Sequence, residues 1–353
     1  FCTTPLCSPS RASFLTGRYP HSHGIIDNTD RSQRSHDLIT FPLLLQRVGY
    51  ETAFVGKWHM GNDDTPRPGF DHWLCMKGQG ETIDPEFNEN GKQIKLNGYV
   101  TDILTDYCVQ LITRHHSKSS LVKKPLCIVV SHKALHPNSK QFDDGSTQKI
   151  GPGGSIPAER HKQLYEGVSI PRRPNCLDTL VGKPVLQRSV DGQTPFSKST
   201  ATSAKTILDR QRMLAAVDDG LGAIFKALSE IDALDQTLIV VTSDHGFFYG
   251  EHCLGTQRRL AYEEGIRIPL LLRYPPLIPS PTSIDFTALS LDLAPTLLEL
   301  AGAKIPDNLH GCSLVPVLRG DTMPARQSFL VEYFSDRVYP RIRNMGYQAV
   351  RTD

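Results

Sequence analysis

Cys7 lies in a setting that suggests chemistry. It begins the run C-S-P-S-R at 7–11, which continues to L-T-G-R at 15–18. A proline-fixed turn leading into a helix would place the thiol at a helix N-terminus, with Arg11 about one turn further on. Such a position favours anions and lowers the pKa of a thiol, so Cys7 is a candidate nucleophile or part of an oxyanion site. A lone cysteine is more often a buried structural residue, and that alternative stands at this point.

Residues that could bind an anion or a metal follow three separate apolar runs. Lys57 and His59 are two apart in G-K-W-H, and on an extended segment they would share a face suited to an anionic group. His136 closes the run S-H-K-A-L-H-P, and Asp244 and His245 follow an apolar run. Solvated strand ends, or a turn stabilised by the aspartate, are the simpler interpretations of these positions.

The elements that must position these residues alternate along the chain. Short apolar strands are predicted at 52–55, 126–130, 238–241 and 268–272, and helices at 100–112, 203–231 and 291–301. Near-continuous apolar strands favour an α/β fold with a mixed, mostly parallel sheet between helices. Polar residues just after such strands would gather at the edge of the sheet where ligands bind. The long connection at 138–198 is expected to form a wall or lid of that site.

Composition excludes several classes of function. A hydrophobic content of 39%, a charged content of 22% and a net charge of +2 suit an ordinary globular protein and predict no nucleic-acid partner. No apolar run approaches the ~20 residues of a membrane span. The eight cysteines show no C-x-x-C spacing, so a zinc ribbon is not expected. Gly78-Gln79-Gly80 lacks the setting of a phosphate-binding loop, and Asp218 and Asp219 are expected on a solvated helix face.

The complete run from Cys7 to residue 18 resembles the signature of sulfatases, C-x-P-S-R followed by L-T-G-R. In that family the cysteine is oxidised after synthesis to formylglycine, an aldehyde. The resemblance therefore implies formylglycine derived from Cys7, a formylglycine-generating enzyme as a maturation partner, and an alkaline-phosphatase-like fold. It further implies a catalytic domain at 1–319 and the beginning of a small C-terminal subdomain at 320–353. We expect the chain to be truncated at both ends.

The resemblance also implies roles for individual residues. Lys57 and His59 match a tetrad that binds formylglycine and sulfate, and His136 matches a sulfate ligand and proton donor in the pattern K-A-x-H. G-E-H at 250–252 and R-R-L-A-Y-E-E at 258–264 match a further segment, with Arg258 where the family typically has a lysine. Arginine can grip sulfate with two hydrogen bonds but cannot serve as a proton donor, because its pKa stays above ~12.

Asp244 and His245 resemble the metal-binding pair of sulfatases, with residue 7 as a third ligand. From the residues alone, a histidine ligand suggests zinc or another transition metal, because calcium prefers oxygen. The resemblance instead implies Ca²⁺, with Mg²⁺ as the alternative. Two further acidic ligands of the family are expected upstream of this sequence.

The implied reaction is hydrolysis of a sulfate ester. A hydroxyl of the hydrated aldehyde would attack sulfur, with Arg11, Lys57 and Arg258 neutralising the sulfuryl oxygens. His136 would protonate the departing alcohol, and His59 would take a proton from the second hydroxyl.

The predicted substrate is a sulfated carbohydrate, such as N-acetylglucosamine 6-sulfate. The alternatives are a broad arylsulfatase, a phosphodiesterase or phosphonate hydrolase of the same fold, and a non-catalytic protein that binds sulfated glycans. Export to the periplasm or the exterior is expected rather than a lysosomal location. The sequence contains no N-x-[ST] acceptor, which counts against a glycosylated lysosomal or secreted animal enzyme.

Overall fold

The computed structural model describes residues 1–118, 124–151, 153–176, 179–255, 258–278, 282–334 and 339–352. Its largest sheet has five strands in the order β4-β3-β2-β1-β5. The central strands β1 (Glu51–Lys57), β2 (His72–Met76) and β5 (Leu126–Ser131) run parallel, and β3 (Glu86–Glu89) and β4 (Lys92–Lys95) extend the sheet antiparallel. Three antiparallel pairs complete the described strands: β6 (Ser139–Gln141) with β7 (Thr147–Lys149), β8 (Ile239–Thr242) with β9 (Leu270–Arg273), and β10 (Ser328–Tyr333) with β11 (Tyr347–Thr352).

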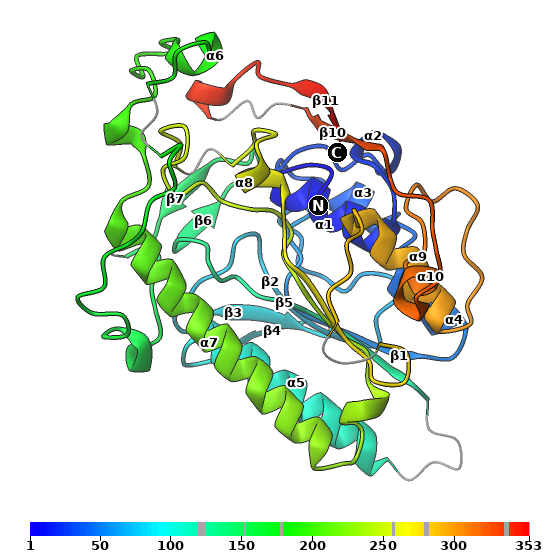
Figure 1. Ribbon diagram of the computed structural model, residues 1–353. Helices are drawn as coiled ribbons and strands as arrows, with labels where there is room; N and C mark the ends of the chain where they lie inside the picture. Colours follow the sequence, from blue (N-terminus) through cyan, green and yellow to red (C-terminus); the bar gives the residue numbers. More distant parts are fainter. Residues whose placement is uncertain are drawn as a thin grey trace.

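Helices cover both faces of the large sheet (Figure 1). The long helices α5 (Val100–Ser117) and α7 (Ala204–Ser229) lie side by side on one face, and α1 (Cys7–Thr16), α4 (Phe41–Arg47) and α9 (Leu293–Leu300) lie on the other. Shorter helices are α2 (Pro20–His23), α3 (Ser32–His36), α6 (Pro184–Gln187), α8 (Glu263–Ile266) and α10 (Val315–Arg319). Single 3-10 turns occupy Glu159–His161, Lys198–Thr200, Leu234–Gln236, Ser290–Asp292 and Pro340–Ile342. Among the described residues, no helix has both the length and the apolar character needed to cross a lipid bilayer.

The two faces of the sheet are set by the alternation of side chains along β1. Phe54 points to the cluster that contains Trp73 and the residues of α1, α4 and α9, whereas Ala53 and Val55 point to the cluster that contains Leu104 of α5. Because side chains on a strand alternate with a period of two, one buried strand supplies both cores. Burial of each large apolar side chain stabilises the fold by about 1.5–3 kcal/mol.

The predicted α/β class is confirmed, and the predicted helices lie where expected, although the first extends to Ser117 instead of ending at residue 112. The helix predicted at 203–231 is α7, and Gly220 gives it close contact with α5. A Cβ at Gly220 would clash with the hydroxyl of Thr105, so the two helices approach at a residue without a side chain. The apolar face of α7 from Leu214 to Leu228 instead faces a cavity, and Leu214 is 53% exposed.

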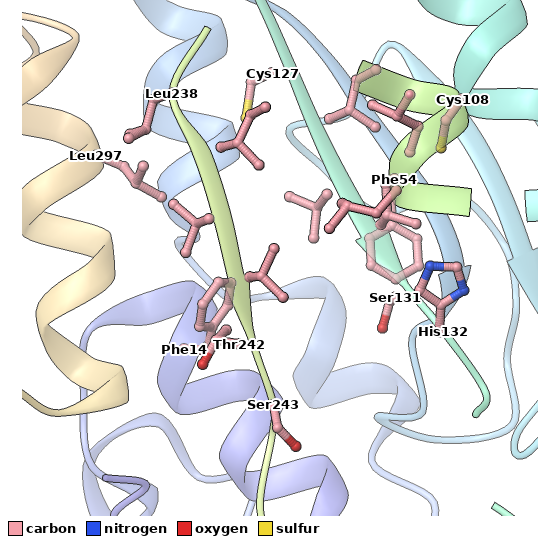
Figure 2. A pocket seen from close by; sticks show the side chains of 18 of the residues that line it. Phe14, Phe54, Cys108, Cys127, Ser131, His132, Leu238, Thr242, Ser243 and Leu297 are labelled. Carbon is pink, nitrogen blue, oxygen red and sulfur yellow. The ribbon is translucent and has the colours of Figure 1, made fainter. Parts of the chain in front are cut away.

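This cavity of about 1150 Å³ separates β5 from β8. Figure 2 shows the two strands on either side of it, with the side chains of Cys127, Leu238, Leu297 and Phe14 around the space. Its lining changes from apolar to polar toward the carboxyl ends of the strands, where it includes Arg11, Lys57, His136, Asp244 and His245. The cavity therefore joins the hydrophobic interior to the edge of the sheet at which polar residues were predicted to gather.

The C-terminal hairpin β10–β11 packs against the beginning of the chain. The amide of Glu332 donates to the carbonyl of Thr3 at 3.0 Å, and Phe329 and Val331 share a buried cluster with Cys2 and Leu291. The subdomain boundary expected at residue 320 remains a prediction.

Glu51, at the start of β1, carries a prediction on stability. Lys118 Nζ lies 2.5 Å from its carboxylate, His72 Nε2 2.6 Å and His115 Nδ1 3.1 Å. Burial would raise the pKa of Glu51, but hydrogen bonds from these three groups lower it to about 2. The ionised carboxylate therefore stabilises the fold fully above roughly pH 4.5, and this contribution disappears as pH falls toward 2.

We expect Glu51→Gln to reduce the free energy of unfolding by about 2 kcal/mol at pH 7, because the variant lacks the ionised carboxylate. The loss is not larger because solvent screens part of the interaction with exposed Lys118. The difference from the unmodified protein should shrink between pH 4.5 and 2. Urea unfolding at several pH values measures both effects, and exposed Glu86 on β3 provides the control Glu86→Gln. An equal loss in both variants would contradict the assignment.

Candidate active site

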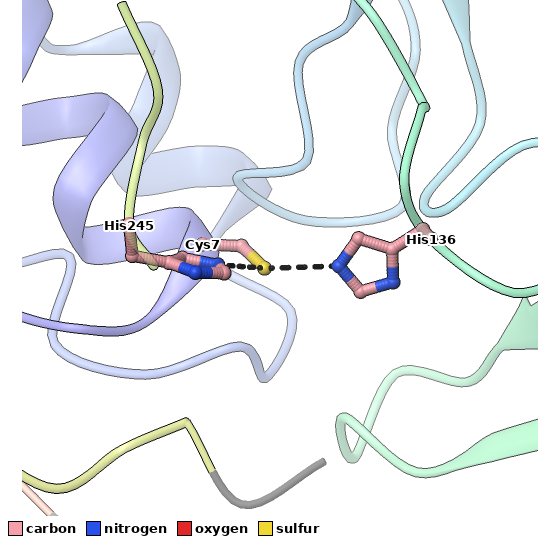
Figure 3. A group of neighbouring side chains, drawn as sticks. All are labelled: Cys7, His136 and His245. Carbon is pink, nitrogen blue, oxygen red and sulfur yellow. Dashed lines mark hydrogen bonds between the residues drawn. The ribbon is translucent and has the colours of Figure 1, made fainter. Parts of the chain in front are cut away.

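Cys7 is the buried first residue of α1, and side chains from three distant segments converge on its sulfur. His245 Nε2 lies 3.3 Å and His136 Nε2 3.7 Å from Cys7 Sγ, one on each side of it (Figure 3). Arg258 Nη2 donates to the same sulfur at 3.0 Å. The convergence predicted from the sequence for these four residues is thus present in the structure.

The Arg258 guanidinium contacts the whole group. Its Nε donates to His245 Nε2 at 3.0 Å, and its Nη2 lies 3.4 Å from His136 Nε2. His245 Nδ1 lies 2.9 Å from the carbonyl of Gly246 and donates to it, which leaves Nε2 as the acceptor. Burial would raise the pKa of the Cys7 thiol, but the charges of Arg258 and Lys57 hold this pKa well below its usual range. The site is therefore built to receive negative charge.

Lys57 adds a second cation to the site. It ends β1 and is only 1% exposed, and its Nζ makes no hydrogen bond within the described ranges of the chain. Burial lowers the pKa of Lys57 to about 8. The close approach of β1 to β5 at this point depends on Gly56, which has φ 118°, because a Cβ there would clash with the carbonyl of Ser131. A buried, unpaired ammonium is costly unless an anion compensates it.

Arg11 contacts the carboxyl ends of three strands, β1, β5 and β8, and pairs with Asp244. Arg11 Nε donates to Asp244 Oδ2 at 3.0 Å, and its Nη1 donates to the carbonyl of Lys57 at 2.6 Å and to the Ser131 hydroxyl. Burial would raise the pKa of Asp244, but His245 and Arg11 lower it, so the carboxylate is ionised. These contacts make Arg11 a positioning residue, and its expected contact with sulfate remains a prediction.

The residues predicted to bind a metal also lie together. His245 Nε2 is 3.7 Å from Asp244 Oδ1 and 3.3 Å from Cys7 Sγ, so three donor groups can face one ion. The sulfur, His136 and His245 form a second three-residue group. Arg258 contacts all three of its donor atoms, and two of them, the sulfur and His245 Nε2, also belong to the first set, so only the Asp244 carboxylate distinguishes the two sets. The set of Asp244, His245 and Cys7 fits a hard divalent ion better, because it includes a carboxylate. Ca²⁺, for example, takes six to eight oxygen ligands. Asp244 and His245 would supply part of that shell.

His59 is held by two amide side chains that were not predicted as site residues. Its Nε2 contacts Gln141 Oε1 and lies 3.0 Å from Gln79 Nε2, and its buried Nδ1 has no hydrogen-bond partner. Its φ of 61° is unusual for a residue other than glycine and costs on the order of 1–3 kcal/mol. Burial and Lys57 lower the pKa of His59 to about 4, so the ring is neutral near pH 7. A bond from Nε2–H to Gln141 would leave Nδ1 free to accept a proton.

The sequence carried only weak signals for the residues that it missed. Gln79 belongs to the G-Q-G run that had been assigned to an ordinary loop, and Gln141 lies in the long connection expected to form a wall of the site. Phe247 follows the Asp244-His245 pair by two residues, and its ring centroid lies 5.5 Å from that of His245 and 5.9 Å from that of His136. Only its position after a strand could have indicated it.

The contact between Gln141 and His59 leads to a prediction. We expect Gln141→Leu to lower kcat by about 10- to 100-fold with little change in KM, because His59 would lose its orientation but Lys57 and Arg258 would remain. Steady-state kinetics test this, and exposed Gln148 on the same hairpin provides the control Gln148→Leu. If both variants had the same kcat, the positioning role would be wrong.

Comparison with known proteins agrees with this geometry. Residues 1–303 match the family model described as Sulfatase. The chain is 30% identical to the N-acetylglucosamine-6-O-sulfatase of Bacteroides thetaiotaomicron, over 96% of this chain and 67% of that protein. It is also 30% identical to the N-acetylglucosamine-6-sulfatase of Homo sapiens, over 94% of this chain and 60% of that protein. The chain thus spans about two thirds of the length of these relatives.

Solved structures show the same fold. A protein in complex with its substrate D-glucosamine-2-N,6-O-disulfate superimposes with a TM-score of 0.80 at 29% identity, covering 100% of this chain and 78% of that chain. A phosphonate monoester hydrolase from Silicibacter pomeroyi has a TM-score of 0.68 at 21% identity, covering 98% and 77%, and supports the fold alone. Because the family model covers most of the described residues and includes the signature at Cys7, the chain belongs to the sulfatase family.

Proposed function

We propose that this protein hydrolyses sulfate esters of a sulfated carbohydrate of the N-acetylglucosamine 6-sulfate type. The observation that carries the proposal is the buried ammonium of Lys57, which has no hydrogen-bond partner in the described part of the chain and lies near Arg258 and Cys7. Two buried cations beside a nucleophile position require an anionic substrate group, and a sulfuryl group supplies it. The names of the N-acetylglucosamine-6-sulfatase relatives support the choice of sugar.

Sulfatases generally use a formylglycine and a divalent metal, and we assign these to Cys7 and to the pair Asp244 and His245. Cys7 Sγ then marks the place of a formylglycine oxygen. Calcium is the proposed ion, with magnesium as the alternative, because the ionised carboxylate of Asp244 suits a hard cation. A divalent ion held there would add positive charge that favours ionisation of an attacking hydroxyl.

The remaining steps belong to side chains around residue 7. Arg258 and Lys57 would bind the sulfuryl oxygens and stabilise the negative charge that grows on them as sulfur is attacked. His136, whose Nε2 lies 3.7 Å from Cys7 Sγ, would give a proton to the departing sugar hydroxyl. Burial, Lys57 and Arg258 hold the pKa of His136 well below its usual range in the free protein, so this role requires the bound sulfuryl group to offset the two cations. His59 would accept a proton at its free Nδ1 and so release sulfate and restore the aldehyde. Arginine at position 258 leaves the proton-donor role to His136.

Mass spectrometry of the peptide that contains Cys7, from protein made in its native host, tests the nucleophile directly. Conversion to formylglycine by a formylglycine-generating enzyme lowers the peptide mass, whereas an unmodified thiol would favour a non-catalytic protein that binds sulfated glycans. Rates with a sulfate ester and a phosphate ester of one leaving group then separate a sulfatase from a phosphonate or phosphate hydrolase. Faster cleavage of an aryl sulfate than of sulfated N-acetylglucosamine would point to a broad arylsulfatase.

Export from the cytoplasm is part of the proposal. Relatives include an extracellular sulfatase homologue of Drosophila melanogaster, which is 29% identical over 94% of this chain but only 29% of that protein. Polymeric sulfated glycans are extracellular material in many settings, so an exported enzyme would meet its substrate. Fractionation of the native host with detection of the protein measures this, and a purely cytoplasmic protein would contradict it.

A further inference from the structure

Arg210 is a buried cation that the proposed reaction does not use. It lies on α7 and is 2% exposed, and its Nε and Nη1 have no hydrogen-bond partner among the residues that the structure describes. The neighbouring carboxylate of Asp209 is instead bound by Lys205 at 2.5 Å and by Arg212 at 3.2 Å. The rings of Phe247 and Tyr249, whose centroids lie 4.1 and 5.8 Å from its guanidinium carbon, are its neutral neighbours, and Tyr249 also offers a hydrogen bond. A guanidinium stays charged at every physiological pH, so burying it without a counter-ion costs several kcal/mol. A cost of this size calls for a compensating anion.

Arg210 lies close to the reaction centre, so an anion bound to it would also lie there. Its guanidinium carbon lies 4.1 Å from the centroid of the Phe247 ring, and the guanidinium carbon of Arg258 lies 5.2 Å from the same centroid. The Phe247 ring also contacts His136 and His245, and Phe247 and Tyr249 line the cavity that reaches the site. Two arginines thus share one aromatic ring, and only one of them contacts the residue 7 group.

We propose that Arg210 binds a second oxyanion on the same substrate, so that the protein selects doubly anionic sugars over singly sulfated ones. This inference rests on the proposed sulfatase function and deepens it. Arg258 and Lys57 hold the sulfuryl group that is cleaved, and Arg210 holds the other anion next to Phe247. The planar guanidinium presents paired N–H groups that match a sulfate or a carboxylate equally well. A sulfate and a carboxylate would therefore both bind to Arg210, and the experiment below distinguishes between them.

Three sugars distinguish the possibilities: N-acetylglucosamine 6-sulfate, glucosamine 2-N,6-O-disulfate, and a disaccharide of a uronic acid with 6-sulfated N-acetylglucosamine. We expect kcat/KM of the unmodified enzyme to be at least about tenfold higher for one of the two doubly anionic sugars, and the preferred one identifies the second anion as sulfate or carboxylate. Arg210→Met should lose this preference, and Arg212→Met, a control on the same helix, should keep it. A missing preference, or one that survives Arg210→Met, would overturn the proposal.

A binding measurement separates this proposal from the proposed reaction. If none of the three sugars is hydrolysed, the sulfatase assignment fails, but calorimetric titration of the two doubly anionic sugars against Cys7→Ala still tests Arg210. Affinity that falls about tenfold or more in Cys7→Ala/Arg210→Met would support a second anion site, and unchanged or undetectable affinity would refute it.

Thermal unfolding distinguishes an anion-binding role of Arg210 from a structural role. Methionine keeps the apolar stem of the side chain but removes a buried charge, so Arg210→Met should unfold at the same or a higher temperature than the unmodified protein. A fall of more than a few degrees without ligand would show that Arg210 already has a structural partner, which would overturn the inference.

Discussion

Replacing Cys7 with alanine should abolish sulfate ester hydrolysis and leave the fold intact. The expected loss in kcat is about 10⁴-fold or more, because the variant has no group that can become the aldehyde nucleophile while the binding residues remain. Little stability should be lost, because the alanine leaves α1 unchanged and removes a sulfur surrounded by positive groups. Release of inorganic sulfate and thermal unfolding measure the two effects.

Cys108→Ala is a suitable control for this experiment. Cys108 is also buried, but it lies in the cluster on the α5 face of the sheet, and burial raises the pKa of its thiol to about 12. The control should lose some stability through a small cavity and keep its kcat. Activity that survived in Cys7→Ala, or that disappeared equally in Cys108→Ala, would refute the role of Cys7.

Lys57→Met should lower kcat/KM by about 10²- to 10³-fold without lowering stability. The ammonium has no hydrogen-bond partner among the described residues, so its contribution appears only when negative charge develops on the bound sulfuryl group. Methionine fills similar space at the end of β1 and removes an uncompensated buried charge, so the unfolding temperature should stay the same or rise. Kinetics with N-acetylglucosamine 6-sulfate and a thermal melt of the same preparation test both statements.

A second buried lysine provides the contrast. Lys133 is also 1% exposed, but its Nζ donates to the carbonyls of Gln79 and Pro137, each at 3.1 Å. Lys133→Met should therefore destabilise the protein by about 1–3 kcal/mol, because two buried acceptors lose their donor. A large loss of stability in Lys57→Met, comparable to that of Lys133→Met, would mean that Lys57 has a structural role instead.

Positions next to the ends of regular elements were predictable from the sequence. Cys7 begins a helix, Lys57 ends a strand, and Asp244 follows one, and each lies at the edge of the sheet where the pattern indicated. The helix at 203–231 was also found within two residues, because its periodicity is a local property. Periodicity did not reveal which face of that helix would pack, and the apolar face from Leu214 to Leu228 lines the cavity.

The sequence by itself determined the family signature, the class of fold and most of the residues around Cys7, because these depend on short spacings and on the ends of strands and helices. Only the tertiary structure decided that Arg258 reaches the sulfur, that Gln141 contacts His59, and that two nitrogens of the buried Arg210 have no hydrogen-bond partner among the described residues. Those contacts join segments up to 251 positions apart. Their geometry arises from how whole elements pack, and no local pattern encodes the distance between two side chains that meet only in the folded chain.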